Sequence, residues 1–152
     1  MPAMRPAEEL RYLILAAQRE GNRLLGQALK PLGVTTSQAE VIRVLEERQP
    51  LTLNGLGELL VCESGSPSRL VDRLVSAGLV TRESAAHDRR HIEIALTPSG
   101  AQLARQVAEI EESLYRSIDA LTHTHDTGQL TDFLRAFVAG LPSGQALVNR
   151  MA

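Results

Sequence analysis

Four arginines in the middle of the chain have side chains suited to binding the phosphates and base edges of a nucleic acid. Arg69 and Arg73 are four residues apart, so a helix places both on one face. An arginine that bonds guanine in bidentate fashion discriminates between bases by about 1–3 kcal/mol. Arg89 and Arg90 lie in a polar stretch between two apolar segments, where a hairpin tip can carry them into a narrow minor groove. The two pairs together predict contacts with duplex DNA.

A serine-rich turn precedes the first arginine pair. Ser64, Ser66 and Ser68 can bond phosphates or base edges, and the unpaired amides at a helix start add positive potential there. Ser66 followed by Pro67 is typical of a helix start, with the serine as N-cap and the proline at the first helical position. Near the second pair, Asp88 is expected to brace an arginine. These residues complete the predicted DNA-binding set.

The basic helix also has a simpler interpretation as a solvated face. Asp72 can contact Arg69 or Ser76 within the same helix, and a surface turn with the sequence Asp-Arg-Arg is common. Either feature alone is a weak signal. Their combination, with the hairpin directly after the helix, favours DNA binding.

Apolar periodicity and helix-start signals predict the elements that must position these residues. Thr52 and the Thr97-Pro98 pair resemble the start signal at residue 66. From the N-terminus the expected elements are a helix over 8–29, a helix from 36 to Pro50, a short helix over 53–60, a helix from Pro67 to Gly78, strands over 79–83 and 92–96 joined by the tip 84–90, a long helix after Pro98, and a final helix through 130–141.

Two short helices joined by a turn and followed by a two-stranded hairpin form a winged helix-turn-helix, whose second helix can enter the major groove. The fold class is therefore mainly α with a small β-hairpin wing. The chain has 152 residues, of which 43% are hydrophobic, which suits one compact domain or one protomer of an intertwined dimer. No apolar run approaches a membrane span, and no secretory signal is visible, so a cytoplasmic location is expected.

Overall charge gives the DNA-binding prediction no support, because the formal net charge is -2. The charge is unevenly distributed, however. Residues 64–91 carry five arginines and three acids, a formal +2, which leaves -4 for the remainder. This asymmetry is consistent with a local DNA-facing surface.

Motifs for catalysis and for cofactor binding are lacking. No Walker A loop, GxGxxG, HExxH or GxSxG sequence occurs, so an enzyme is not expected and no cofactor is predicted. His123, His125 and Asp126 are the densest group of candidate metal ligands, but a polar loop between helices explains them equally well. His87 and His91 lack partners at zinc-site spacing. No metal site is predicted.

Four segments resemble the MarR family of bacterial regulators, named for multiple antibiotic resistance. They are Ser68-Arg69-Leu70-Val71-Asp72-Arg73-Leu74, Gly78-Leu79-Val80, Asp88-Arg89-Arg90 and Leu96-Thr97-Pro98-Ser99-Gly100. The resemblance covers nearly the whole chain. It implies dimerisation helices in 1–35 and 101–152 around a DNA-binding lobe in 36–100. Leu13, Leu24, Leu114, Phe133 and Phe137 then lie either in the homodimer interface or in the core of their own chain.

The resemblance also implies a function. A homodimer would bind a palindromic operator in double-stranded DNA, act as a repressor, and be released by a small-molecule effector. Tyr12 and Tyr115 are candidate pocket residues, although side chains at helical spacing more often serve packing. The alternatives are a winged-helix protein-interaction module and a small-molecule binding protein without specific DNA binding.

The single cysteine, Cys62, cannot form an internal disulfide, which agrees with a reducing compartment. Some members of the family use an oxidisable cysteine as a sensor, typically in the first helix. Cys62 instead lies near the turn before the basic helix. We expect it to be a small buried or half-buried filler.

Overall fold

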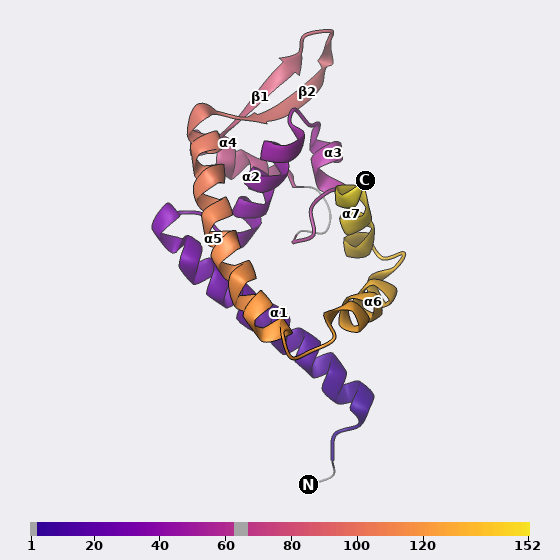
Figure 1. Ribbon diagram of the computed structural model, residues 1–152. Coiled ribbons are helices and arrows are strands. Elements are labelled where there is room, and N and C mark those ends of the chain that lie inside the picture. Colours follow the sequence, from indigo (N-terminus) through magenta and orange to yellow (C-terminus); the bar gives the residue numbers. More distant parts are fainter. Residues whose placement is uncertain (1–2, 63–66) are drawn as a thin grey trace.

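Three helices and a β-hairpin in the middle of the chain lie between a long N-terminal helix and a second long helix, which leads into two shorter C-terminal helices (Figure 1). The computed structural model describes residues 3–62 and 67–152. In chain order the elements are α1 (Pro6–Leu29), the short 3-10 helix η1 (Lys30–Leu32), α2 (Thr36–Arg48), α3 (Leu53–Gly57), α4 (Ser68–Ser76), β1 (Val80–Ala85), β2 (Asp88–Leu96), α5 (Pro98–Thr122), α6 (Thr127–Val138) and α7 (Pro142–Met151).

Threonine caps start three of these helices, two of them as predicted at Thr52 and Thr97. The hydroxyl of Thr52 accepts from the Gly55 amide, and that of Thr97 accepts from the Gly100 amide, both at 3.0 Å. Thr35 forms a full capping box with Gln38 at the start of α2. The short helix α3 ends at Gly57 rather than near residue 60, since two glycines give it little intrinsic helix propensity.

The predicted start of the basic helix was wrong by one residue. Helix α4 begins at Ser68, and Pro67 occupies the capping position instead of the first helical position. The Pro67 backbone has φ -79° and ψ 13°, outside the helical region, while its carbonyl accepts from the Val71 amide at 2.9 Å. Ser66, the predicted N-cap, lies outside the described residues.

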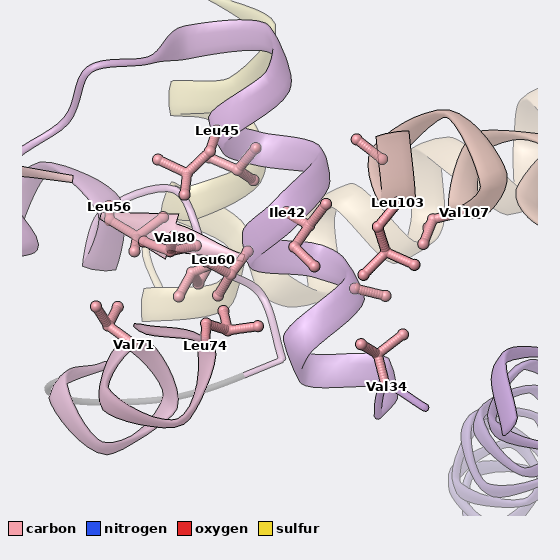
Figure 2. Packing of buried hydrophobic residues seen from close by; sticks show 14 of the residues in the cluster. Val34, Ile42, Leu45, Leu56, Leu60, Val71, Leu74, Val80, Leu103 and Val107 are labelled. Atoms are coloured by element: carbon pink, nitrogen blue, oxygen red, sulfur yellow. The ribbon is translucent and has the colours of Figure 1, made fainter. Parts of the chain in front are cut away.

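The core forms where the inner faces of α2, α3, α4 and α5 meet (Figure 2). Val71 and Leu74 of α4 are fully buried, which confirms the apolar stripe predicted for this helix. They pack in one cluster with Ile42 of α2 and with Val107 near the start of α5. This packing sets which face of α4 points outward.

A close contact joins the end of α4 to the start of α5. Gly78 has a φ of 74°, which ends the helix, and its carbonyl accepts from the Thr97 hydroxyl at 2.7 Å. A Cβ atom on Gly100 would lie 2.0 Å from the carbonyl oxygen of Leu79. Only glycine allows this approach, so residues 78–80 and 96–100 form one structural joint.

The hairpin is longer than predicted, and its arginines lie on a strand rather than in the loop. Ser84 pairs with Ile92, but Ala85 pairs with Asp88, so the register shifts by a bulge on β2. Arg89 and Arg90 fall within that bulge. The extra residues of a bulge bend and twist a strand, which re-aims their side chains.

The prediction of a single helix after residue 128 was wrong, because the chain forms α6 and α7 there. Gly140 separates them with a φ of 75°. Gly144 then packs so closely that an added Cβ would lie 2.0 Å from the carbonyl oxygen of Val138. Pro142 at the start of α7 is the sequence signal for this helix, the same one that predicted α5.

The end helices expose apolar side chains that the central segment does not cover. Among the exposed residues are Leu13, Leu24, Ile118, Leu121, Phe133 and Phe137. The rings of Phe133 and Phe137 lie 6.2 Å apart on α6. None of the helices in the described residues has the length and apolar character needed to cross a membrane.

Candidate nucleic-acid interface

Helix α4 presents a basic face to solvent. Arg69 and Arg73 are exposed, while Val71 and Leu74 of the same helix are buried against the core. The core thus fixes the outward direction of both guanidinium groups. Ser68 is half-buried at the start of the same helix.

One predicted residue of this helix start does not fit the interface as expected. Pro67 is buried, so its ring belongs to the lobe and not to a DNA-facing surface, contrary to our prediction. Ser64 and Ser66 lie outside the described residues, and their predicted contacts stay predictions.

The wing supplies a second exposed pair, Arg89 and Arg90. Asp88, which was expected to brace an arginine, accepts from the backbone amide of Arg90 at 2.9 Å. It therefore holds the backbone that carries Arg90 rather than pairing with a guanidinium group.

A fifth arginine has a structural role that the sequence did not indicate. Arg82 of β1 forms an ion pair with Asp72 of α4, and it also donates to the Ser68 carbonyl at 3.5 Å. Asp72 was expected to find its partner within its own helix. The sequence offered one signal for this pair: the predicted helix and the predicted strand follow one another and carry opposite charges at Asp72 and Arg82. Arg82 thus links the wing to the basic helix.

The other four arginines differ from Arg82 in a way that matters for ligand binding. Within residues 3–62 and 67–152, the guanidinium groups of Arg69, Arg73, Arg89 and Arg90 have no hydrogen bond or ion pair. They are exposed on α4 and on the wing that follows it. An anion bound there would gain charge-assisted bonds without breaking existing ones.

The carboxylate of Glu40 on α2 holds residues 61 and 62, which follow α3. Glu40 accepts from the amide of Val61 at 2.7 Å and from the amide of Cys62 at 2.8 Å. Cys62 itself is exposed, so the prediction that it fills the interior was wrong. Its place in the turn is fixed by its backbone rather than by burial of its thiol.

A network of ion pairs joins α2 to α5. Arg43 pairs with Glu46 and donates to Glu111 at 2.8 Å. Burial opposes the charged form of Arg43, but the hydrogen bond to Glu111 and the two carboxylate charges outweigh it and raise its pKa. Burial and the charge of Glu111 also raise the pKa of Tyr115 above its ordinary value of 10.0.

The two predicted pocket tyrosines are about half-exposed, Tyr12 on α1 and Tyr115 on α5. The guanidinium carbon of Arg11 lies 4.2 Å from the centre of the Tyr12 ring. A shallow cavity of about 370 Å³ opens elsewhere, where α1 meets α2. Its lining residues are Asn22, Gly26, Lys30, Gly33, Val34, Thr35 and Thr36. Neither tyrosine lines this cavity.

The histidines do not assemble with other ligands. His125 contacts its neighbour Thr124 and the Leu121 carbonyl in the last turn of α5. In the described part of the chain, no three His, Cys, Asp or Glu side chains come close enough to hold a metal ion.

A helix-turn-helix followed by a two-stranded wing defines a winged-helix protein, and comparisons with known proteins agree. A sequence model of the MarR family matches residues 32–91. The organic hydroperoxide resistance transcriptional regulator of Bacillus subtilis is 31% identical over 107 residues, which cover 70% of this chain and 73% of that protein. The multiple antibiotic resistance protein MarR of Escherichia coli is 31% identical over 98 residues, which cover 64% and 68%.

Solved structures extend the similarity to the whole architecture. A cysteine-to-serine mutant of Escherichia coli MarR, complexed with operator DNA, is 27% identical with a TM-score of 0.75. The match covers 86% of this chain and 94% of that one. The chain belongs to the MarR family of winged-helix, DNA-binding transcription regulators.

Proposed function

We propose that this chain is a sequence-specific repressor that binds a palindromic operator in duplex DNA as a homodimer. The observation that carries the proposal is the set of four exposed arginines on α4 and the wing, which bond to none of the described residues through their guanidinium groups, beside a fifth that is held in an ion pair. Such a regulator works in the cytoplasm, where the chromosome lies. No catalytic role is proposed, since the named relatives are transcriptional regulators.

Different arginines have different roles in this proposal. Arg69 and Arg73 of α4 read base edges in the major groove, with Ser64, Ser66 and Ser68 bonding the adjacent backbone. Arg89 and Arg90 of the wing enter the neighbouring minor groove, where the negative potential is enhanced. Asp88 and Arg82 fix the wing that carries them.

The homodimer is supported by the apolar surface of the end helices. Leu13 is 59% exposed, Leu24 51% and Phe137 60%, which argues against a role in the core of their own chain. Segments 1–35 and 101–152 would bury these faces against a second copy, while 36–100 contacts DNA. Two copies of α4 then face half-sites about 10 bp apart.

A small-molecule effector would release the dimer from DNA in this proposal. The cavity between α1 and α2 and the half-exposed Tyr12 and Tyr115 are the places where it could bind.

The test compares Arg73→Ala with Arg90→Ala on duplexes that the parent protein selects from a random library. Arg73→Ala should relax base preference at one position per half-site, at a cost of about 1–3 kcal/mol. Arg90→Ala should weaken binding evenly across sequences and flatten the salt dependence by about one unit of slope per half-site. Fluorescence anisotropy over a salt series measures both effects.

Arg105→Ala is the matched control, because Arg105 is an exposed arginine on α5 that loses the same charge away from α4 and the wing. Equal effects of Arg73→Ala and Arg90→Ala on every sequence would show that base readout is misassigned. If the intact dimer selects no sequence at low salt, a winged-helix module for protein interaction or for small-molecule binding replaces the repressor.

A further inference from the structure

The carboxylate of Glu40 on α2 receives three hydrogen bonds. Besides the two backbone amides of the α3–α4 turn, at Val61 and Cys62, it accepts from the guanidinium of Arg150 on α7 at 3.0 Å. The Glu40 side chain is only 14% exposed. One half-buried carboxylate thus joins three segments that lie far apart in the sequence.

Helix α7 lies beside α3 (Figure 1), and two further bonds tie it to the lobe. Asn149 donates to the carbonyl of Glu58 at 2.9 Å, at the residue that ends α3. The Arg150 carbonyl accepts from Arg48, at the end of α2, at 2.6 Å. The C-terminal helix therefore contacts both ends of residues 58–62, directly at Glu58 and through Glu40 at Val61 and Cys62.

This segment leads into the basic helix, so its geometry bears on DNA recognition. In a helix-turn-helix the turn sets the angle between its two helices, and hence how the second helix enters the groove. Hydrogen bonds to a charged carboxylate are stronger than bonds between neutral groups. If the Glu40 carboxylate is lost, the amides of Val61 and Cys62 must find other partners. Glu40 therefore has the position and the strength to fix the turn.

We propose that Glu40 is a positioning residue for operator recognition, through which α7 holds the turn that precedes the basic helix. The inference rests on the proposed function, because it assigns Glu40 to the same DNA-binding event. It adds a contact route from the α6–α7 end of the molecule to residues 58–62, which precede α4 in the sequence. Glu40 itself touches no DNA in this arrangement.

The direction of the effect separates this proposal from simple electrostatics. Glu40→Gln removes one negative charge, which by charge alone should strengthen DNA binding. If Glu40 positions the turn, the variant should instead bind about tenfold more weakly to a duplex of about 30 bp selected by the parent, which holds two half-sites. Binding to a scrambled duplex at low salt should not weaken. Anisotropy titration of the full chain measures both constants.

Glu47→Gln is the matched control, since Glu47 is exposed on the same helix and loses the same charge. It should bind both duplexes as tightly as the parent, or slightly more tightly. Thermal unfolding of each variant shows whether the fold is retained. If Glu40→Gln follows Glu47→Gln in its preference for the selected duplex, the proposal is overturned.

The contribution of α7 is tested with Arg150→Met, which keeps the apolar stem and removes the charge. It should lower the preference for the selected duplex about threefold, with Arg116→Met on α5 as the control for a lost positive charge. The double variant Glu40→Gln with Arg150→Met should be no worse than Glu40→Gln alone, because both act through one contact. Fully additive losses would overturn the role of α7.

Amide hydrogen exchange tests whether Glu40 holds residues 61 and 62, and it does so independently of whether the chain binds DNA specifically. In Glu40→Gln, exchange at Val61 and Cys62 should speed up, while the amide of Leu56, bonded within α3, should not change. Unchanged exchange at both amides overturns the anchor whatever the DNA result. A parent chain with no sequence preference overturns the proposed function, while the exchange result still decides whether Glu40 holds the turn.

Discussion

The central lobe and the end helices differ in how they satisfy their apolar side chains. In the lobe, α2, α4 and the hairpin bury theirs within one chain, and residues such as Ile42 and Leu74 are fully covered. Among its described residues, α6 has no buried side chain, and α1 has only Leu29. The lobe therefore covers its apolar side chains within the chain, whereas α1 and α6 leave most of theirs exposed.

This difference gives the two regions separate roles. The lobe holds α4 in place by packing within the chain, whereas the end helices carry exposed apolar side chains. Burial of Val71 and Leu74 in the lobe determines which face of α4 carries the arginines. The end helices reach the lobe through the joint at Gly100, through the Arg43–Glu111 pair and through the contacts of Glu40. Changes at the ends can reach α4 through these contacts and through the apolar packing of α5, which shares the core cluster with α4.

Truncation of a core residue should have the largest effect. Leu74→Ala removes a fully buried side chain from α4 and should cost about 2–5 kcal/mol of unfolding free energy. The loss should be the same at every protein concentration, because the lobe packs within one chain. Urea unfolding followed by circular dichroism, at several protein concentrations, measures it.

Leu13→Ala on α1 is the comparison, since Leu13 is 59% exposed. It should lower only the concentration-dependent part of the stability, which comes from burial between copies. A concentration-independent loss as large as that of Leu74→Ala would mean that α1 packs within its own chain, and the contrast between the regions would fail.

The same substitution at two glycines should have opposite effects in the two regions. Gly100→Ala drives a Cβ into the Leu79 carbonyl at 2.0 Å and should cost about 1–3 kcal/mol. Gly21→Ala lies in the middle of α1, where an added Cβ meets nothing within 4 Å. It should stabilise the helix by about 0.5–1 kcal/mol. Thermal unfolding of both variants gives the comparison, and stabilisation by Gly100→Ala would refute the joint.

Local signals in the sequence predicted most of the lobe. Threonine caps at Thr52 and Thr97 and the apolar stripe of α4 depend on neighbours a few residues away, so spacing alone reveals them. The start of α4 was misplaced by one residue because a proline can occupy either the cap or the first helical position. The helix α7 was missed because its start signal, Leu141-Pro142, lacks a capping side chain.

The candidate site was predictable only in part, for a related reason. Exposed arginines on a helix face follow from the apolar stripe opposite them. The pair between Arg82 and Asp72, and the anchoring of the turn by Glu40, join residues that meet only when separate elements pack. No spacing rule encodes such contacts, so sequence reasoning assigned Asp72 to its own helix and did not reveal the contacts of Glu40 with the turn.

The smallest expected effect concerns Tyr115, which lies on α5 at the border of the two regions. Burial and the charge of Glu111 raise its pKa in the folded chain above 10.0. The folded protein then keeps this proton at a pH where the unfolded chain has lost it. The resulting stability is present below the unfolded pKa and is lost as the pH rises through the folded one.

The chain has only two tyrosines, so Tyr12→Phe leaves Tyr115 as the single phenol to follow by ultraviolet absorbance. The folded variant should titrate at a higher pH than the same variant unfolded in guanidinium chloride. Adding Glu111→Gln should lower the folded midpoint, since it removes one of the charges that hold the proton, though burial remains. If the phenol of Tyr115 titrates in the folded variant at or below the pH of the unfolded variant, its side chain is fully exposed to solvent. Helix α5 would then not pack against the lobe at this residue.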